Sequence, residues 1–182
     1  RKNTFYSPRK QTRAKRRKAK LKNIFTPWRM DFIKSKKPEH CVFCKAGANI
    51  GGEDKDFIVH RGEKCFVILN RYPYATGHIM IITYKHCQKF EDLGDEELSE
   101  MMILAKKFVP VLKLAFAPDG FNMGMNLGAA AGAGIADHIH LHIVPRWIGD
   151  TNFMPVLAEV KIHPTDLEGV YKAILQALKA TA

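Results

Sequence analysis

The sequence predicts an α+β domain with a mainly antiparallel, five-stranded sheet, one long covering helix and a C-terminal helix. Short segments rich in β-branched residues recur along the chain. A long central stretch repeats apolar residues with a helical period, and a second such stretch lies near the C-terminus. The 182 residues suffice for one ordinary domain, and 46% hydrophobic with 26% charged residues is typical of globular proteins.

Five segments are expected to form the strands, because each is short and rich in branched or aromatic residues. Residues 70–73, Asn-Arg-Tyr-Pro, form a turn between the second and the third. Pro145 is expected to end the fifth, since proline cannot donate a ladder hydrogen bond. The five segments are residues 57–60, 64–69, 77–84, 121–127 and 137–147.

Two helices are expected, at residues 95–117 and 166–180. In the first, three acidic residues lie in the opening turn, where they complement the helix dipole. Pro110 is expected to kink or divide this helix. Steps of three, four and seven residues give it one apolar face. That face comprises Leu98, Met101, Met102, Ala105, Phe108, Leu112 and Phe116.

The charge divides the chain into a basic arm, residues 1–22, which we expect to be disordered, and a domain, residues 23–182. Eleven of the 29 Lys and Arg residues lie in the arm, which has no acid, so 18 basic residues face 18 acidic ones in the remainder. Such an arm binds nucleic acid through salt-sensitive phosphate contacts, or is a solvated, disordered extension with no specific partner. Both interpretations stay open. Residues 25–33 contain apolar side chains that can dock on a core or a partner subunit.

The cysteine usage and the hydropathy indicate a reducing, cytoplasmic location. Four cysteines in a chain of this length do not resemble a secreted disulfide scaffold. The basic N-terminal stretch has no apolar core of a secretory signal, and no apolar run approaches the roughly 18–20 residues of a membrane span. We therefore expect no membrane association. Residues 41–47, CVFCKAG, are expected to form a turn-rich knuckle.

Residues 137–147, DHIHLHIVPRW, place His138, His140 and His142 at alternate positions. A strand sends alternate side chains to the same face, so the three imidazoles should share one face and the aliphatic residues the other. The Gly/Ala-rich loop 128–134 leads into this strand, and its backbone N–H groups can hold an anion. A phosphate held there would face a neutral imidazole, which is a good nucleophile near pH 7.

A catalytic zinc ion held by the three histidines is the rival interpretation of this strand. A straight strand spreads its alternate imidazoles further apart than ligands about 2.0–2.1 Å from one metal require. The Gly/Ala-rich loop would also have no role in such a site. The pattern therefore favours phosphorus chemistry.

HIHLHIV resembles the signature of the histidine-triad superfamily of nucleotidyl transferases and hydrolases. The resemblance extends from about Thr26 to Pro155. Within it, VILNRYPYATGHIMI is similar to the family's strand, substrate-binding Asn, turn and Gly-His strand. Residues 146–156, RWIGDTNFMPV, resemble the bacterial branch that phosphorolyses diadenosine tetraphosphate. The resemblance implies a histidine-triad-like fold and a homodimer.

The resemblance also implies roles for individual residues. His140 matches the nucleophile, His142 the contact to the α-phosphate, and His138 a residue that orients the centre or binds a metal. The remaining matches concern nucleotide and phosphate binding: Asn70 for the ribose, Asn126 ahead of the phosphate loop, and the backbone groups of Gly134 and Ile135. Many members have Gly-Gln-Ser or Gly-Gln-Thr before the triad, whereas this chain has Ala-Gly-Ile, which places more weight on backbone donors.

Cys41-x-x-Cys44 has the spacing of half a zinc site or of a redox pair. In related nucleotidyltransferases and some bacterial triad proteins, a His after the Gly-His strand and the first triad His complete a zinc site. Those positions correspond to His86 and His138. The alternative is two reduced cysteines in a turn without metal. No organic cofactor is implied.

The sequence thus predicts an enzyme that cleaves dinucleoside polyphosphates, such as diadenosine tetraphosphate, by phosphorolysis through an AMP-histidine intermediate. Its partners would be an adenine nucleotide, inorganic phosphate and a second copy of the chain. Two alternatives stay open. One is a histidine-triad hydrolase that uses water as the acceptor, and the other is a nucleic-acid-associated protein that acts through residues 1–22. Base preference and polyphosphate length are not encoded in any motif that we identify.

Overall fold

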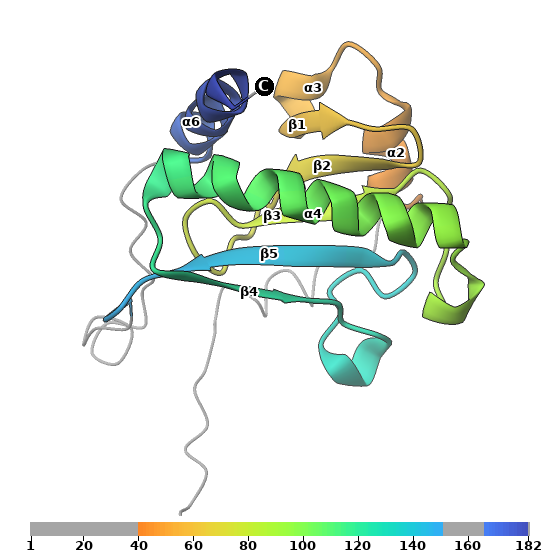
Figure 1. Ribbon diagram of the computed structural model, residues 1–182. Coiled ribbons are helices and arrows are strands. Elements are labelled where there is room, and N and C mark those ends of the chain that lie inside the picture. The colour runs from red at the N-terminus through yellow and green to blue at the C-terminus, as the bar shows by residue number, and fades with distance from the viewer. Residues whose placement is uncertain (1–39, 151–165, 182) are drawn as a thin grey trace, which may run out of the picture.

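The computed structural model describes residues 40–150 and 166–181. Five strands form one antiparallel sheet, as the sequence predicts, and their order in the sheet is β1-β2-β3-β5-β4 (Figure 1). The strands are β1 Ile58–Arg61, β2 Cys65–Leu69, β3 Ile79–Thr83, β4 Gly120–Gly124 and β5 His140–Arg146. The basic arm 1–22, the segment 25–33 and most of the segment 146–156 lie outside the described residues.

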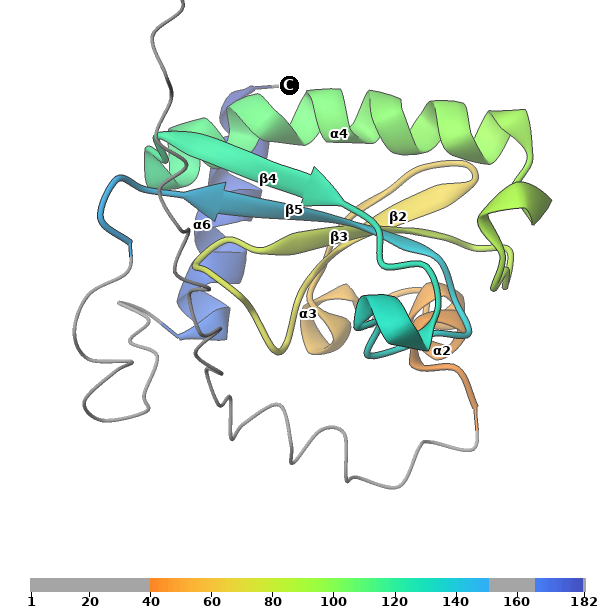
Figure 2. The same ribbon diagram turned by 90° about the horizontal axis from the view of Figure 1, so that it is seen from below.

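The helices cover both faces of the sheet. The long helix α4 and the C-terminal helix α6 pack on one face, and the short helix α2 lies on the other (Figure 2). None of the helices in the described ranges has the length and apolar character of a transmembrane span. The helical elements are α2 Val42–Ala48, α3 Glu53–Asp56, η1 Phe90–Asp92, α4 Asp95–Phe116, η2 Ala129–Ala131 and α6 Leu167–Ala180.

The strands distribute their side chains between two cores by simple alternation. On β3, Ile79 and Ile81 join the core under α4 and α6, whereas Met80 and Ile82 join the smaller core under α2. The same rule holds on β5, where Leu141 and its odd-numbered neighbours face α4. The even-numbered histidines therefore face the side of α2, on one face as the alternation predicts.

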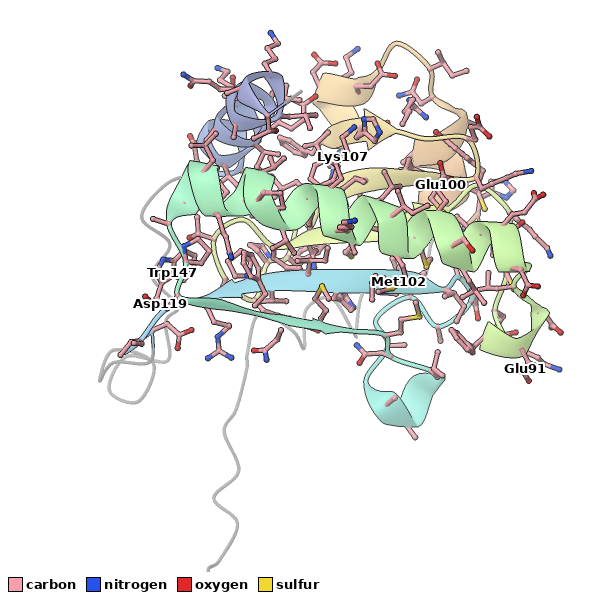
Figure 3. All side chains as sticks on the ribbon, in the orientation of Figure 1. Glu91, Glu100, Met102, Lys107, Asp119 and Trp147 are labelled. Carbon is pink, nitrogen blue, oxygen red and sulfur yellow. The ribbon has the colours of Figure 1, made fainter. Side chains whose placement is uncertain are left out.

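The long helix is continuous, and Pro110 does not divide it. Proline removes one backbone donor and leaves the carbonyl group four residues earlier without a helical partner. Here both Pro110 and Lys106 are exposed, so water can bind that carbonyl. The expectation that Met102 is a core residue is wrong. Its side chain is 55% exposed on the outer surface of α4, and it is labelled in Figure 3.

Two further expectations need correction. The knuckle at residues 41–47 is instead the helix α2, which buries Phe43 against the sheet. Pro145 does not end β5, which continues to Arg146. The pairing of β5 with β3 ends at Ile143, so Pro145 lies where β5 has only β4 as a neighbour among the described strands. A proline is tolerated at such an edge-like position.

Candidate active site and metal cluster

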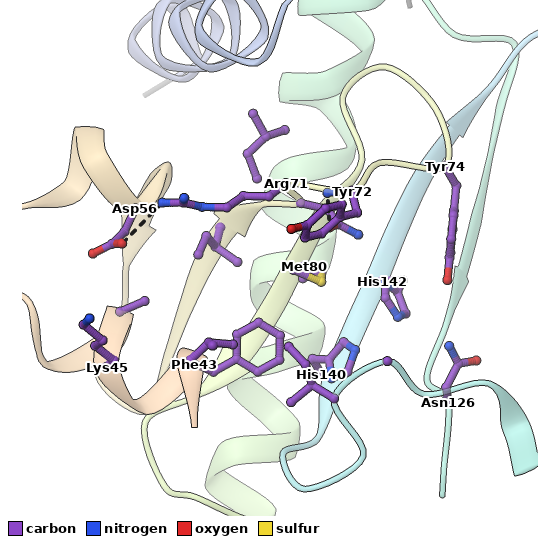
Figure 4. A pocket seen from close by; sticks show the side chains of 17 residues that line it. Phe43, Lys45, Asp56, Arg71, Tyr72, Tyr74, Met80, Asn126, His140 and His142 are labelled. Atoms are coloured by element: carbon purple, nitrogen blue, oxygen red, sulfur yellow. Dashed lines mark hydrogen bonds and ion pairs between the residues drawn. The ribbon is translucent and has the colours of Figure 1, made fainter. Parts of the chain in front are cut away.

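A pocket of about 410 Å³ opens on the α2 side of the sheet, between α2, the turn after β2 and the loop before β5 (Figure 4). This volume suits a small-molecule ligand. His140 and His142 line one end, and Lys45, Asp56 and Arg71 line the other. The wall between them is mainly apolar. It is formed by Val42, Phe43, Ala46, Ile68, Leu69 and Met80.

The hydrogen bond of His140 fixes which of its ring nitrogens is free to react. Nδ1 of His140 lies 2.8 Å from the carbonyl oxygen of His138. A carbonyl oxygen only accepts, so Nδ1 carries the proton and the lone pair is on Nε2. The side chain is 5% exposed and lines the pocket. This is the protonation pattern of a nucleophilic imidazole.

His142 is held in the opposite tautomer by a chain of two hydrogen bonds. The backbone N–H of Tyr74 donates to Nδ1 of His78 at 3.0 Å, so the proton of His78 is on Nε2. That Nε2–H donates to Nδ1 of His142 at 2.9 Å. The proton of His142 is therefore on Nε2. The rings of His140 and His142 meet edge to face with centroids 4.7 Å apart, so a donor lies next to the nucleophilic ring.

Burial keeps these imidazoles neutral. Loss of solvation lowers the pKa of His140 below its ordinary value of 6.5, and the hydrogen bond to the carbonyl of His138 opposes this only in part. Burial, with a smaller contribution from the charge of His140, lowers the pKa of His142 to about 4. At neutral pH His140 can therefore attack, and His142 can donate from Nε2 without itself bearing a positive charge.

A second group of side chains lies behind the pocket. Cys41, Cys44, His86 and His138 each offer one ligand atom, and the four atoms lie within 4.8 Å of one another. The Sγ atom of Cys41 is 3.3 Å from Nδ1 of His138, and the Sγ atom of Cys44 is 3.3 Å from Nδ1 of His86. This group, named the Cys/His cluster below, consists of the four residues that the sequence resemblance implies as zinc ligands.

The donor set of the Cys/His cluster fits a tetrahedral metal ion such as zinc. Bond lengths of about 2.3 Å to sulfur and 2.0–2.1 Å to nitrogen place neighbouring ligand atoms of a tetrahedron about 3.4–3.8 Å apart. Three sulfur–nitrogen distances within the cluster, 3.3, 3.3 and 3.6 Å, are close to that range, and all four ligand atoms lie within 4.8 Å of one another. Nε2 of His138 donates to the carbonyl oxygen of Thr83 at 2.9 Å, which leaves the lone pair on Nδ1, facing the thiols. The cluster can therefore hold a metal.

A family model described as the HIT domain matches residues 51–147. The chain belongs to the HIT family. An AP-4-A phosphorylase of Mycobacterium tuberculosis is 34% identical to this HIT-family chain over 151 residues, which cover 79% of this chain and 77% of the relative. An uncharacterized HIT-like protein of Methanocaldococcus jannaschii is 37% identical over 135 residues, covering 74% of this chain and 98% of the relative.

Two further matches bear on activity and on metal binding. An adenosine 5'-monophosphoramidase of Candida albicans is 33% identical over 110 residues, covering 58% of this HIT-family chain and 70% of the relative. A solved structure of a zinc-bound histidine triad family protein from Mycobacterium smegmatis superposes with a TM-score of 0.63 and 26% identity. It covers 77% of this chain and 94% of the other. These matches confirm the family resemblance and the fold that it implies.

The structure brings together the residues that sequence reasoning selected. Residues expected to contact the nucleotide line one pocket with two of the triad histidines: Asn70, Asn126, Gly134, Ile135, His140 and His142. His138 does not line the pocket and lies with the Cys/His cluster instead. It also precedes β5, which begins at His140, so the triad strand is shorter than expected.

His78, which contacts His142 directly, is the residue of the candidate site that sequence reasoning missed. It lies in a strand-like apolar segment, GHIMI, and its side chain has no exposed surface. A histidine within an apolar strand segment is expected to be buried, and a buried imidazole needs hydrogen-bond partners. The position of His78 in GHIMI is therefore the signal in the sequence that could have been used. Its partner His142 is 64 positions away in the chain, so only the pairing of the sheet reveals the contact.

Proposed function

We propose that this protein is a nucleotidyl transferase that cleaves a dinucleoside polyphosphate, such as diadenosine tetraphosphate, by phosphorolysis. It is a nucleotide-processing enzyme of the HIT family, and the relative named AP-4-A phosphorylase supports this substrate. The observation that carries the proposal is the hydrogen bond from Nδ1–H of His140 to the carbonyl of His138, which frees Nε2 in the pocket.

In the first step, Nε2 of His140 attacks the α-phosphorus. The N–P bond forms as the bond to the leaving polyphosphate oxygen breaks, which gives AMP-histidine and, from diadenosine tetraphosphate, ATP. Nε2–H of His142 donates to a phosphoryl oxygen as negative charge develops there. An oxygen of inorganic phosphate then attacks the same phosphorus, the N–P bond breaks, and ADP leaves with His140 restored.

The remaining pocket residues bind and orient the nucleotide. The apolar wall around Phe43 and Ile68 suits a purine base, and the side-chain amide of Asn70 suits the ribose hydroxyl groups. Asn126 and Gly134 line the pocket, and Figure 4 shows Asn126 on the side of His142, where the phosphates would lie. Ile135 packs against the smaller core, so its side chain offers no hydrogen bond to the acceptor. Backbone donors would then hold the phosphate.

Hydrolysis of the same intermediate by water is the second candidate, supported by the relatives named adenosine 5'-monophosphoramidase. The two reactions differ in product. Phosphorolysis gives ADP, with a yield that depends on phosphate, whereas hydrolysis gives AMP with or without phosphate. Chromatography of the products, with and without phosphate, distinguishes them.

Replacement of His140 by Ala tests the nucleophile. Turnover should fall by about 10⁴-fold or more, because no other described side chain in the pocket offers an unprotonated nitrogen next to His142. AMP binding should change little. His60→Gln is the matched control, since His60 is a half-buried histidine outside the pocket. Wild-type turnover in His140→Ala would exclude the mechanism.

We propose that the Cys/His cluster holds zinc, which would fix the start of α2 and the start of β5 to each other. Two thiolates and two imidazoles are a well-known structural zinc set, and the zinc-bound structural relative supports this metal. Metal analysis of Cys41→Ser/Cys44→Ser should show loss of stoichiometric zinc, whereas Cys87→Ser should retain it. Zinc that persists in the double variant would contradict this ligand set.

We also propose that the partner is a second copy of the chain and that residues 23–182 form the catalytic domain. Strand β4 is an edge of the described sheet. Exposed apolar side chains lie on it and on α4: Met123, Met102 and Ile103. An unpaired edge beside apolar surface favours association between copies. Sedimentation analysis should give a dimer, and Met123→Lys should shift it towards monomer.

A further inference from the structure

Helix α2 carries half of the Cys/His cluster and one wall of the pocket on the same few residues. Cys41 is its N-cap and Cys44 lies in its first turn, where both take part in the cluster. The residues between and after them line the pocket: Val42, Phe43, Lys45 and Ala46. Any displacement at the start of α2 therefore moves the pocket wall.

A helix of seven residues depends on contacts at both ends, because isolated helices shorter than about 12–15 residues are marginal in water. The C-terminal end of α2 is fixed by Arg61 of β1. Its guanidinium donates to the carbonyl oxygens of Gly47 at 2.8 Å and Asn49 at 2.9 Å. No side chain caps the N-terminal end. The sulfur atoms of Cys41 and Cys44 there lie 3.3–3.6 Å from the imidazole nitrogens of the cluster.

The other half of the Cys/His cluster adjoins the nucleophile. The ring of His138 is a member of the cluster, and the carbonyl group of the same residue accepts the proton of His140 Nδ1. Phe43 of α2 contacts the rings of both His138 and His140, with ring centroids 5.7 Å and 5.1 Å away. Figure 4 shows Phe43 beside His140. His138 therefore contacts the other ligands of the cluster through its ring and orients the imidazole of His140 through its carbonyl group.

We infer that a metal ion in the Cys/His cluster positions the α2 wall of the pocket and His140 together. The metal ligands act as positioning residues, so the ion sets nucleotide affinity and turnover in addition to stability. The turnover part rests on the proposed function, whereas the affinity part requires only that the pocket binds AMP. The measured affinity scales with the fraction of molecules in which the wall is in place.

His86→Ala tests the inference with the least disturbance, because His86 is exposed and does not line the pocket. The matched variant His86→Cys supplies a third thiolate in its place and should retain zinc. Ile174→Ala on α6 is the stability control, since Ile174 is fully buried in the core on the opposite face of the sheet. Zinc content, melting temperature, AMP affinity by calorimetry, and kcat and KM are measured for all four proteins.

His86→Ala should lose zinc, bind AMP about tenfold more weakly and lower kcat about tenfold or more. His86→Cys should stay within about threefold of the wild type. Ile174→Ala should lower the melting temperature with little change in AMP affinity. If His86→Ala retains metal, zinc is instead removed from the wild type with a chelator and then added back. Removal should weaken AMP binding, and added zinc should restore it.

The inference is overturned if zinc-free protein binds AMP and turns over substrate as the loaded protein does. It is also overturned if Ile174→Ala, with the same decrease in melting temperature as the zinc-free protein, weakens AMP binding as much as the loss of zinc does. Failure of the proposed function gives a different result. In that case the zinc-loaded wild type binds AMP and cleaves no dinucleoside polyphosphate, and the AMP affinities still test the positioning role.

Discussion

Replacement of His78 should reduce turnover although this residue does not line the pocket. Its Nε2–H donates to Nδ1 of His142, and its own Nδ1 accepts from the backbone N–H of Tyr74. His78→Phe keeps a ring of similar size but has no donor. His142 is then free to place its proton on Nδ1, which leaves a lone pair on Nε2 facing the phosphoryl oxygens. The interaction that stabilises developing charge becomes repulsive.

The size of the effect follows from the burial of the two rings. His78 has no exposed surface and His142 is 9% exposed, so water cannot replace the lost donor. A buried polar group left without its partner costs about 1–3 kcal/mol. At about 1.4 kcal/mol for each factor of ten, kcat should fall roughly 5- to 150-fold. KM should change less, because the apolar wall that contacts the base is not altered.

The assay compares His78→Phe with His78→Gln and with His60→Gln. Glutamine can accept from Tyr74 through its amide oxygen and donate to His142 through its amide nitrogen, so it should recover much of the lost turnover. His60→Gln alters a half-buried histidine near Lys107, away from the site, and should behave as the wild type. Nitrogen chemical shifts report the tautomer of His142 directly. Full turnover in His78→Phe, or equal losses in the Phe and Gln variants, would refute the reasoning.

Four other outcomes are expected. Because burial lowers the pKa of His140 below 6.5, kcat/KM should stay level as the pH falls to 6.5 and decline only below it; an acid midpoint above 6.5 would contradict this. Gly77→Ala should cost about 1–3 kcal/mol in urea unfolding, since φ is +77° and the added Cβ would lie 2.7 Å from Phe116, whereas Gly120→Ala should be near neutral. Glu100 accepts three backbone N–H bonds beside β2 (Figure 3), so Glu100→Ala should cost about 1–3 kcal/mol at pH 7. These bonds outweigh burial and lower the pKa of Glu100, so the loss should shrink as the pH falls through that pKa. Removal of residues 1–22 should abolish any salt-dependent nucleic-acid binding, and equal binding without them would exclude the arm.

The sequence predicts the fold well where one local rule dominates. Alternation along β5 places Leu141 and His140 on opposite faces as expected, and helical periodicity locates α4 within one residue at its end. The same periodicity fails for Met102, which lies at the margin of the apolar face and is exposed. The helix α2 is also missed, because its stability comes from contacts with Arg61 and with the sheet rather than from its own residues.

The site was harder to predict because its hydrogen bonds join distant segments. Periodicity alone predicts three equivalent histidines on one face of a strand. In the structure each of them has a different hydrogen-bond partner. His140 bonds to a carbonyl of its own segment, His142 to His78, and His138 to the carbonyl of Thr83. Composition and spacing do not encode which partner each imidazole meets. Those partners depend on how β5 is aligned with β3.

The register between β3 and β5 therefore specifies the protonation of the site. Met80 pairs with His142 and Ile82 with His140. As a result His78, which directly precedes β3, lies within hydrogen-bond distance of His142, and Thr83, the last residue of β3, lies within hydrogen-bond distance of His138. A shift of one residue would turn the histidines into the core under α4 and the aliphatic residues into the pocket. The burial of Leu141 and its neighbours opposes that shift. The shifted register would place several imidazoles without partners in an apolar core, which is costly. The hydrophobic pattern of β5 thus stabilises the sheet and, through the register, selects the tautomers on which the proposed chemistry depends.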